Sequence, residues 1–144
     1  MTSAFPQSPA VLGTFSQLLS STRRGARLAR LLTSQQLRVW GVPSAVTERA
    51  EQIVAELASN AVLHGQVRGR DFRLALVLDA STWALRIEVT DAHGEQLPTR
   101  MRESEPDDES GRGLLLVTAL ADGWGTEPYP PGGKTVWALV TTNA

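Results

Sequence analysis

The sequence has no cysteine, and it contains only two histidines among its 144 residues. Without cysteine, the chain cannot have a disulfide framework, a thiolate metal site or a cysteine nucleophile. His64 and His93 are also too few for a site in which several histidines hold a metal ion. These absences exclude two common classes of functional site before any pattern is considered.

An excess of charge of either sign is lacking as well. The 14 Lys and Arg residues nearly balance the 15 Asp and Glu residues, so there is no bulk attraction to nucleic acid or to an anionic membrane. Residues 1–13 have neither the basic start nor the apolar run of a signal peptide. No apolar stretch approaches the roughly 20 residues that cross a bilayer. We therefore expect a soluble, cytoplasmic protein that binds neither nucleic acid nor membranes.

Lysine is nearly absent too, because Lys134 is the only lysine among the 14 basic residues. Heavy use of Arg, Ala, Leu and Val with almost no Lys is what GC-rich coding produces, so the composition points to a high-GC bacterium. The length is that of one domain, since domains usually contain about 100–200 residues. Residues 1–13, rich in Ser, Pro and Ala, are expected to form a flexible N-terminal arm, which leaves 14–144 as a single domain.

Apolar periodicity and turn residues predict the order of the elements. Helices are expected after Thr22 and Ser44, two N-cap residues that are separated by the helix-breaking run Gly41-Val42-Pro43. The other predicted elements are strands at 14–20, 72–79, 83–91, 124–127 and 135–140, a long loop at 93–110 and a helix at 114–120. Strands 72–79 and 83–91 are close enough to form a hairpin. This order predicts an α+β fold, a two-layer sandwich whose mainly antiparallel sheet is covered by helices on one face.

Two predicted helices have apolar residues at helical spacing. The first has a buried face expected from Ala26, Leu28, Ala29, Leu31 and Leu32, with Arg23, Arg24, Arg27 and Arg30 facing outward. The second has its apolar face at Val46, Ala50, Ile53, Val54, Leu57 and Ala61.

A polar stripe runs along the second helix at Glu56, Asn60 and His64. A step of four residues turns only about 40° around a helix, so the three side chains follow one slanted line at the edge of the apolar face. A carboxylate and a carboxamide one turn apart suit oxygen coordination of Mg²⁺, and the carboxylate could orient or deprotonate a nucleophile. The alternative is a solvated flank that ends in a histidine favoured by the helix dipole.

Asp91 ends a predicted strand and is followed by Gly94. A carboxylate there can accept a hydrogen bond from an exocyclic amine, but aspartate is also an ordinary turn residue. Two glycine-rich segments come later. Gly111-Arg112-Gly113-Leu114 precedes a helix, where backbone amides can approach a phosphate. Gly132-Gly133-Lys134-Thr135 leads into the last strand and could equally be a plain hairpin turn.

Taken together and in this order, the four segments resemble the ATP-binding domain shared by gyrase, the heat-shock chaperone ATPase, histidine kinases and mismatch-repair ATPases, the GHKL family. The resemblance covers about residues 20–142. The runs E-L-A-S-N-A-V-L-H-G, S-G-R-G-L-L-L-V and G-G-K-T-V-W look most like the small anti-sigma-factor and serine/threonine-protein-kinase branch of actinobacteria, which agrees with the scarcity of lysine. The resemblance implies a Bergerat-type fold and a role in transcription regulation.

The resemblance also implies roles for single positions, with ATP and Mg²⁺ as the bound groups. Glu56 would be the catalytic base, Asn60 the Mg²⁺ ligand and Asp91 the residue that reads the adenine amino group. The other implied nucleotide-binding positions are Gly94 after Asp91, the phosphate-side lid hinge at Gly111, Arg112, Gly113 and Leu114, and Thr135 near the adenine behind Asp91.

The family's adenine motif is Asp-x-Gly-x-Gly, whereas this chain has Asp91-Ala92-His93-Gly94-Glu95. The replaced glycines support an alternative, a degenerate and non-catalytic partner-switching module that binds a regulatory protein without needing ATP. The leading hypothesis is an ATP-dependent regulator that phosphorylates a serine or threonine of an antagonist protein. Its expected partners are a sigma factor, an anti-sigma antagonist or both. The family often pairs, so a homodimer that uses the arginine-rich helix near Arg24 is a further expectation.

Overall fold

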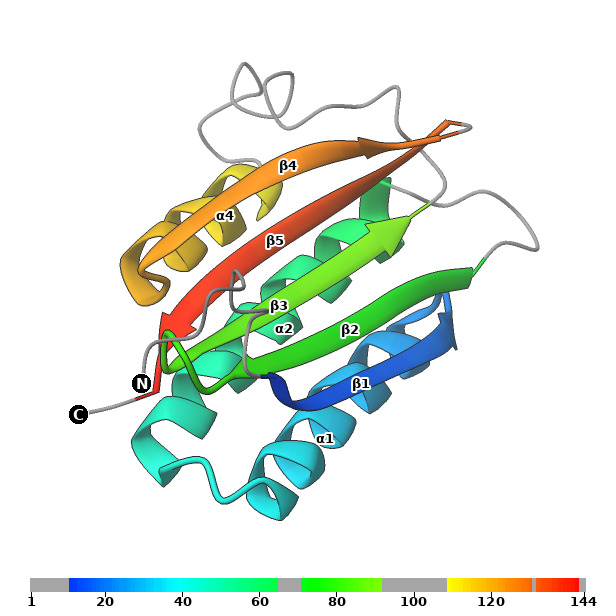
Figure 1. Ribbon diagram of the computed structural model, residues 1–144. Helices are drawn as coiled ribbons and strands as arrows, with labels where there is room; N and C mark the ends of the chain where they lie inside the picture. Colours follow the sequence, from blue (N-terminus) through cyan, green and yellow to red (C-terminus); the bar gives the residue numbers. More distant parts are fainter. Residues whose placement is uncertain (1–10, 65–70, 92–108, 131, 143–144) are drawn as a thin grey trace, which may run out of the picture.

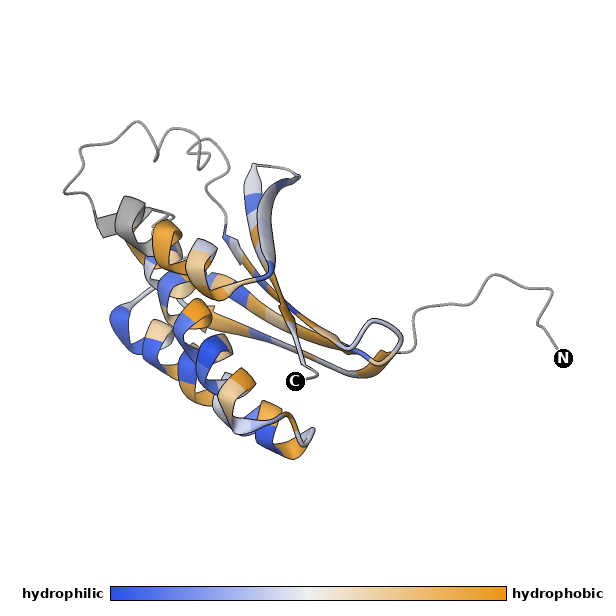
Figure 2. Cartoon of the chain, turned by 90° about the vertical axis from the view of Figure 1, so that its left-hand side faces the viewer, coloured by the Kyte–Doolittle hydropathy of each residue, from blue (hydrophilic) through white to orange (hydrophobic). Residues whose placement is uncertain are grey.

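The computed structural model describes residues 11–64, 71–91, 109–130 and 132–142. In these ranges the fold is α+β, as expected, with three helices packed on one face of a five-stranded sheet (Figures 1 and 2). The sheet order is β1-β2-β3-β5-β4, and every neighbouring pair is antiparallel. The elements in chain order are β1 (Val11–Ser20), α1 (Arg23–Val39), α2 (Ser44–His64), β2 (Asp71–Asp79), β3 (Ala84–Asp91), α4 (Glu109–Leu120), β4 (Gly123–Tyr129) and β5 (Gly133–Thr141).

The predicted hairpin of β2 and β3 is confirmed, with Leu76 opposite Ile87 in the register. Exposure alternates along both strands, because successive side chains of a strand point to opposite faces of the sheet. The apolar residues of one face join the helices in the core. β1 begins at Val11, three residues before the predicted strand. Residues 1–10 lie outside the described residues, so the flexible arm stays a prediction.

α1 begins where the sequence predicted it. The hydroxyl of Thr22 accepts a hydrogen bond of 3.0 Å from the amide of Gly25, as an N-cap does. The buried stripe differs from the predicted one, since Leu28 and Leu31 are 43% and 65% exposed. The residues that pack inward repeat every four positions and are mostly small: Gly25, Ala29, Thr33 and Leu37.

α2 is the central helix, packed against α1, α4 and the sheet. It includes Ser44 as its first residue rather than as its cap, because the carbonyl of Pro43 accepts the first helical hydrogen bond, from Thr47, at 3.0 Å. Several of its residues are fully buried: Ala50, Ile53, Val54 and Ala58.

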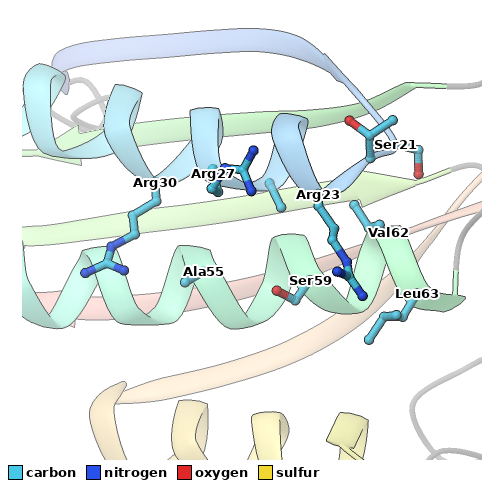
Figure 3. Close-up of a pocket in the computed structure, with 10 residues that line it drawn as sticks. Ser21, Arg23, Arg27, Arg30, Ala55, Ser59, Val62 and Leu63 are labelled. Atoms are coloured by element: carbon cyan, nitrogen blue, oxygen red, sulfur yellow. The ribbon is translucent and has the colours of Figure 1, made fainter.

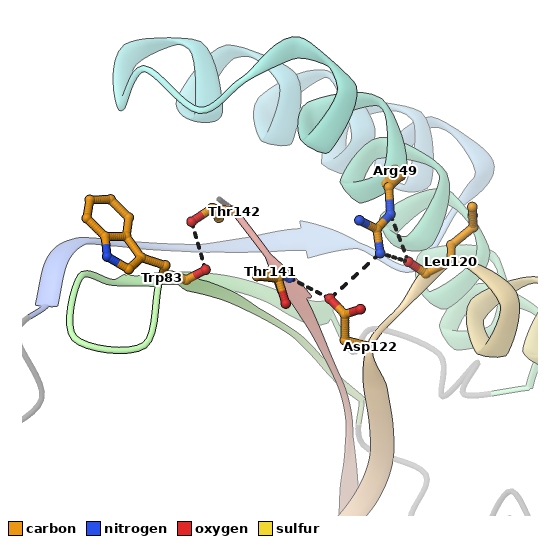
Figure 4. Close-up of polar contacts among 6 residues, drawn as sticks. All are labelled: Arg49, Trp83, Leu120, Asp122, Thr141 and Thr142. Atoms are coloured by element: carbon orange, nitrogen blue, oxygen red, sulfur yellow. Dashed lines mark hydrogen bonds and ion pairs between the residues drawn. The ribbon is translucent and has the colours of Figure 1, made fainter. Parts of the chain in front are cut away.

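Arg49 links the start of α2 to the end of α4 (Figure 4). Its Nε and Nη2 atoms donate to the carbonyl of Leu120, at 3.0 and 2.5 Å, and Nη2 lies 3.7 Å from Oδ2 of Asp122. That same Oδ2 accepts a hydrogen bond of 2.6 Å from the amide of Thr141. The contact joins the first half of α2 to the last turn of α4, and the two helices run in opposite directions (Figure 1).

α4 begins at Glu109, two residues before Gly111 and five before the predicted start at 114. Gly111 and Gly113 therefore belong to the first turns of the helix rather than to a loop ahead of it. Within the described ranges, no helix combines the length and the apolar character that crossing a membrane requires.

Candidate functional site

Glu56 and Asn60, two residues of the polar stripe of α2, lie on the flank that faces α4. Arg49, Glu56 and Asn60 lie on one flank of the helix, because seven residues make almost two turns and four residues one turn. Arg49 reaches the last turn of α4. Since the two helices run in opposite directions, Glu56 and Asn60 lie toward the N-terminal part of α4. Both side chains are half-buried.

The other flank of α2 faces α1. Ala55 and Ser59 line a groove of about 750 Å³ between the two helices, together with arginines of α1 (Figure 3). Glu56 and Asn60 do not line this groove. The helix thus separates two different surfaces, one toward α4 and one toward α1.

Asp91 is the last residue of β3, and it pairs in the register with Lys134 of β5. The two residues are 6% and 3% exposed. Asp91 is two residues after Val89 in β3, and Lys134 is two residues before Val136 in β5. Residues two positions apart in a strand share a face. Because Val89 and Val136 belong to the core, Asp91 and Lys134 lie on the helix-facing side of the sheet. β3 and α2 run in the same direction and finish at the same end of the molecule (Figure 1).

Thr135 lies on the opposite face of the sheet from Asp91, and its expected role near the adenine stays a prediction. It pairs with Thr90, and the two hydroxyl oxygens are hydrogen bonded at 2.7 Å. Neighbouring residues of a strand point to opposite faces, so the residue of β5 that shares a face with Asp91 is Lys134.

Lys134 is a site residue that the sequence reasoning missed. Burial lowers its pKa from the ordinary value of 10.5, and the negative charge of Asp91 opposes that shift without cancelling it. The signal that could have found it is the period of two in β5. Counting back from the core residues Val140, Ala138 and Val136 places Lys134 on the inner face.

Gly133 allows β5 to start close to the end of β3. A Cβ atom at this position would lie 2.5 Å from the carbonyl oxygen of Asp91 and 3.0 Å from that of Tyr129. Any other residue would push the two strands apart at the point where Asp91 and Lys134 face each other. Close packing of the strands beside Asp91 therefore explains why glycine occupies position 133.

The N-terminal turns of α4 contain the backbone of Gly111, Arg112 and Gly113, and the side chain of Leu114 is buried next to them. The first amides of a helix lack partners within the helix and favour negative charge. Gly94, His93 and Glu95 lie outside the described residues, as does the predicted loop up to residue 108. Their expected roles stay predictions.

The donor set of this end of the molecule fits a magnesium nucleotide. No group of three His, Cys, Asp or Glu residues in the described ranges could hold a metal ion, so a metal bound here would need ligands from water and phosphate. Mg²⁺ is usually bound in this way, by one or two protein oxygens and the phosphates of its nucleotide. Glu56 and Asn60 supply such oxygens, α4 packs against the helix that contains them, and Asp91 supplies a buried acceptor.

Known proteins resemble the chain in family and in fold. The family model described as the histidine kinase-like ATPase domain matches residues 19–139. No curated protein matches the chain. Among solved structures, the RsbU and RsbW domains of Rv1364c from Mycobacterium tuberculosis are similar with a TM-score of 0.67 and 20% identity, covering 89% of this chain and 32% of that one. The SiaB-SiaC complex from Pseudomonas aeruginosa is similar with a TM-score of 0.64 and 11% identity, covering 92% of this chain and 90% of that one.

At these identities the two structures show a shared fold. The chain spans about a third of the length of the Mycobacterium tuberculosis chain.

Proposed function

Because the chain belongs to the histidine kinase-like ATPase domain family, we propose that it binds ATP with Mg²⁺ between α2, α4 and the ends of β3 and β5. The observation that supports this most is the burial of Asp91 on the helix-facing side of β3. This strand finishes at the same end of the fold as the part of α2 that contains Asn60. A carboxylate has several acceptor positions on its two oxygens, and an exocyclic amine is a donor that can bind to one of them.

The adenine, the metal ion and the phosphates are each proposed to contact a different part of the site. The carboxylate of Asp91 accepts a hydrogen bond from the amino group of adenine, and the carboxamide oxygen of Asn60 holds Mg²⁺. The N-terminal turns of α4, with Gly111 and Gly113, lie next to the phosphates, where helix amides favour negative charge.

We further propose that the site transfers the γ-phosphoryl group to a serine or threonine of a partner protein. Bound ATP supplies the phosphoryl group, and Mg²⁺ neutralises the charge that develops on it. Glu56 orients the partner's hydroxyl group. Its carboxylate takes the hydroxyl proton as the oxygen bonds to phosphorus and ADP leaves.

The groove between α1 and α2 is the surface we propose for the protein partner (Figure 3). Arg23, Arg27 and Arg30 line it, and none of the three forms an ion pair with a described residue. α1 has no acidic residue at all. A partner with an acidic surface, a sigma factor or its antagonist, would fit this groove by charge complementarity.

Calorimetric titration of the protein with ATP and Mg²⁺ tests the nucleotide site. Asn60→Ala should weaken binding by about tenfold or more with Mg²⁺ present, because loss of a metal contact commonly costs that much. The difference should shrink when the metal is chelated. Ser59→Ala is the matched control, since Ser59 faces the α1 groove, and it should leave the affinity unchanged. Equal affinities of the wild type and Asn60→Ala, or no binding to the wild type, would contradict the proposal.

The second candidate function is a partner-switching module without catalysis, which binds a regulatory protein independently of ATP. The observation that favours it is Lys134, which gives Asp91 a cationic neighbour within the folded protein itself. On this alternative, the affinity for the partner is the same with and without ATP. Detection of a phosphorylated serine or threonine on the partner would exclude it.

A further inference from the structure

The groove between α1 and α2 has two unlike walls. On the side of α1 it is lined by three arginines: Arg23, Arg27 and Arg30. On the side of α2 the lining residues are uncharged: Ala55, Ser59, Val62 and Leu63. None of the described residues that line the groove is acidic. Because the whole chain has a formal net charge of −1, this positive wall is a local feature and does not reflect the overall composition.

The three arginines form a single row along α1. Their spacing is i, i+4 and i+7, which places them on one face of the helix. At 1.5 Å per residue, the row is about 10.5 Å long. Figure 3 shows the side chains of Arg23 and Arg30 extending from α1 toward α2. A negatively charged segment that lies in the groove can therefore contact the row at several points along its length.

The rest of the groove has small and apolar residues. Ala26, Ala55 and Ser59 have short side chains, so the backbone of another helix can approach closely. Leu63 also lines the groove and is 51% exposed, so a partner that covers it removes apolar surface from water. The phosphate backbone of a nucleic acid gains nothing from such a wall, whereas an amphipathic helix can cover it with apolar side chains. The combination of charge and apolar surface favours a protein segment.

We propose that the groove binds one amphipathic α-helix of the protein partner, which turns three carboxylates spaced i, i+4 and i+7 toward α1 and small or apolar residues toward α2. The inference rests on the proposed function, which assigns this groove to the partner, and it names the element of the partner that binds there.

Spacing is the reason for a helix rather than an extended segment. Carboxylates at i, i+4 and i+7 of a helix repeat the spacing of the arginine row, so three ion pairs can form at once when the two helices lie side by side. In an extended segment, three successive side chains on one face span about 13 Å. They match a row of about 10.5 Å less well.

A synthetic peptide tests the inference directly. The probe is an alanine-based peptide of about 20 residues, long enough to form a helix by itself, with three glutamates at i, i+4 and i+7 and leucines on the adjacent flank. One control peptide has the same composition with the glutamates spread around the helix, and another has a central proline, which breaks the helix. Fluorescence anisotropy should show that the wild type binds the probe about tenfold or more tightly than either control, because only the probe matches the charged and apolar walls together.

Two charge reversals on α1 form a matched pair of variants. Arg27→Glu places a negative charge in the middle of the row and should weaken binding of the probe by about tenfold or more, because like charges in contact disfavour association. Arg24→Glu makes the same change at an exposed arginine of the same helix that does not line the groove. At physiological ionic strength it should leave the affinity within about threefold, because exposed charges away from the contact are largely screened.

Ser59→Trp tests the shape of the groove, because it fills the wall of α2 without a change of charge. It should also weaken binding of the probe by about tenfold or more, as overfilling of a well-packed contact does. The thermal midpoint of each variant is compared with that of the wild type, so that a loss of binding is separated from a loss of folding.

Three results would overturn the inference. Equal losses in Arg24→Glu and Arg27→Glu would show a general attraction to α1 rather than docking in the groove. Equal affinities for the probe and the peptide with a central proline would show that the bound segment is not helical. Binding of duplex RNA in place of the probe, lost in Arg27→Glu, would assign the groove to a nucleic acid.

These titrations are made without nucleotide, so they are independent of the proposed ATP site. A wild type that binds ATP with Mg²⁺ but not the probe would overturn this inference and leave the nucleotide site intact. A wild type that binds the probe but not ATP would support this inference and contradict the nucleotide site.

Discussion

Single residues at the end of the sheet give the candidate site its charge, and Lys134 is the clearest case. Its burial lowers the pKa of the ammonium group, and the charge of Asp91 opposes that shift. The protein tolerates a cation where the strand pattern would otherwise place an apolar core residue. Such a buried charged pair is weak evidence for stability, and its position at the proposed base-binding end favours a binding role.

The lowered pKa of Lys134 predicts a pH dependence of stability. Between the folded pKa and the ordinary value of 10.5, the unfolded chain binds more protons than the folded protein. The free energy of unfolding therefore gains a contribution that rises with pH in this interval. Urea denaturation of the wild type and Lys134→Met, from neutral pH to about 10.5, should show this rise in the wild type only. Parallel pH curves for the two proteins would contradict the prediction.

Two substitutions, one on each face of the sheet, test which face binds the nucleotide. Asp91→Asn should weaken ATP binding by about tenfold or more, because the amide offers the amino group of adenine a weaker acceptor than the carboxylate. Thr135→Val should leave the affinity within about twofold, because a hydroxyl on the outer face does not touch the proposed site and its loss affects only one ordinary hydrogen bond. Calorimetric titration measures both. A large loss in Thr135→Val would show that Thr135 takes part in nucleotide binding.

At the scale of elements, two junctions position the helices, one for α1 and one between α2 and α4. α1 approaches the end of β1 so closely that a Cβ atom on Gly25 would lie 1.9 Å from the carbonyl oxygen of Ser20. α2 and α4 are joined through Arg49, which binds the last carbonyl of α4. The first junction requires a residue without a side chain, Gly25. The second requires a long side chain, that of Arg49, which extends from α2 to α4.

Gly25→Ala should destabilise the protein by about 1–3 kcal/mol or more, the usual cost of forcing extra atoms into a packed contact. The clash is with backbone, which cannot move aside without shifting β1 or α1. Gly123→Ala is the control, because a Cβ atom there meets nothing within 4 Å. Thermal or urea denaturation of the two variants gives the comparison, and equal stabilities would show that the junction can relax.

Asp122, at the start of β4, predicts a loss of stability in acid. The hydrogen bond from the amide of Thr141, assisted by Arg49, lowers the pKa of its carboxyl below the ordinary value of 3.8. This stabilisation is complete above 3.8 and is lost as the pH falls through the lower, folded value. Asp122→Asn should therefore lose less stability in that range than the wild type. Acid denaturation curves of the two proteins test this, and curves of equal slope would contradict it.

At the scale of the whole molecule, the proposed site forms only where separate parts of the chain meet. α2 contributes Glu56 and Asn60, α4 its N-terminal turns, and β3 and β5 the pair Asp91 and Lys134. None of these parts lies next to another in the sequence. A ligand that bridges them binds only the folded chain, so it must raise the apparent stability.

Mg²⁺ and ATP together should therefore raise the thermal midpoint of the protein. At a ligand concentration 100 times its Kd, the expected stabilisation is about 2.7 kcal/mol. In Asn60→Ala, addition of Mg²⁺ at a fixed ATP concentration should give little further increase. A thermal shift assay with and without the metal measures both effects. If the thermal midpoint of the wild type does not change when Mg²⁺ and ATP are added, the proposed site is contradicted.

Most of the secondary structure could be predicted from the sequence, because its causes are local. The alternation in β2 and β3, the capping hydroxyl of Thr22 and the apolar spacing of α2 act over a few residues each. The order of the motifs also indicated the family, and the match over 19–139 confirmed it. Glu56, Asn60 and Asp91 were singled out in the same way, and their roles stay proposals.

Only the tertiary structure decided which faces these elements turn toward one another. Leu28 and Leu31 are exposed because α1 packs through smaller residues, and α4 begins at Glu109 rather than after its glycines. The side of α2 that faces α4 follows from a hydrogen bond between residues 71 positions apart. The pairing of β3 with β5 decided that Lys134, and not Thr135, shares a face of the sheet with Asp91. Local patterns specify the elements, whereas contacts between distant residues specify their relative orientation and hence the composition of the site.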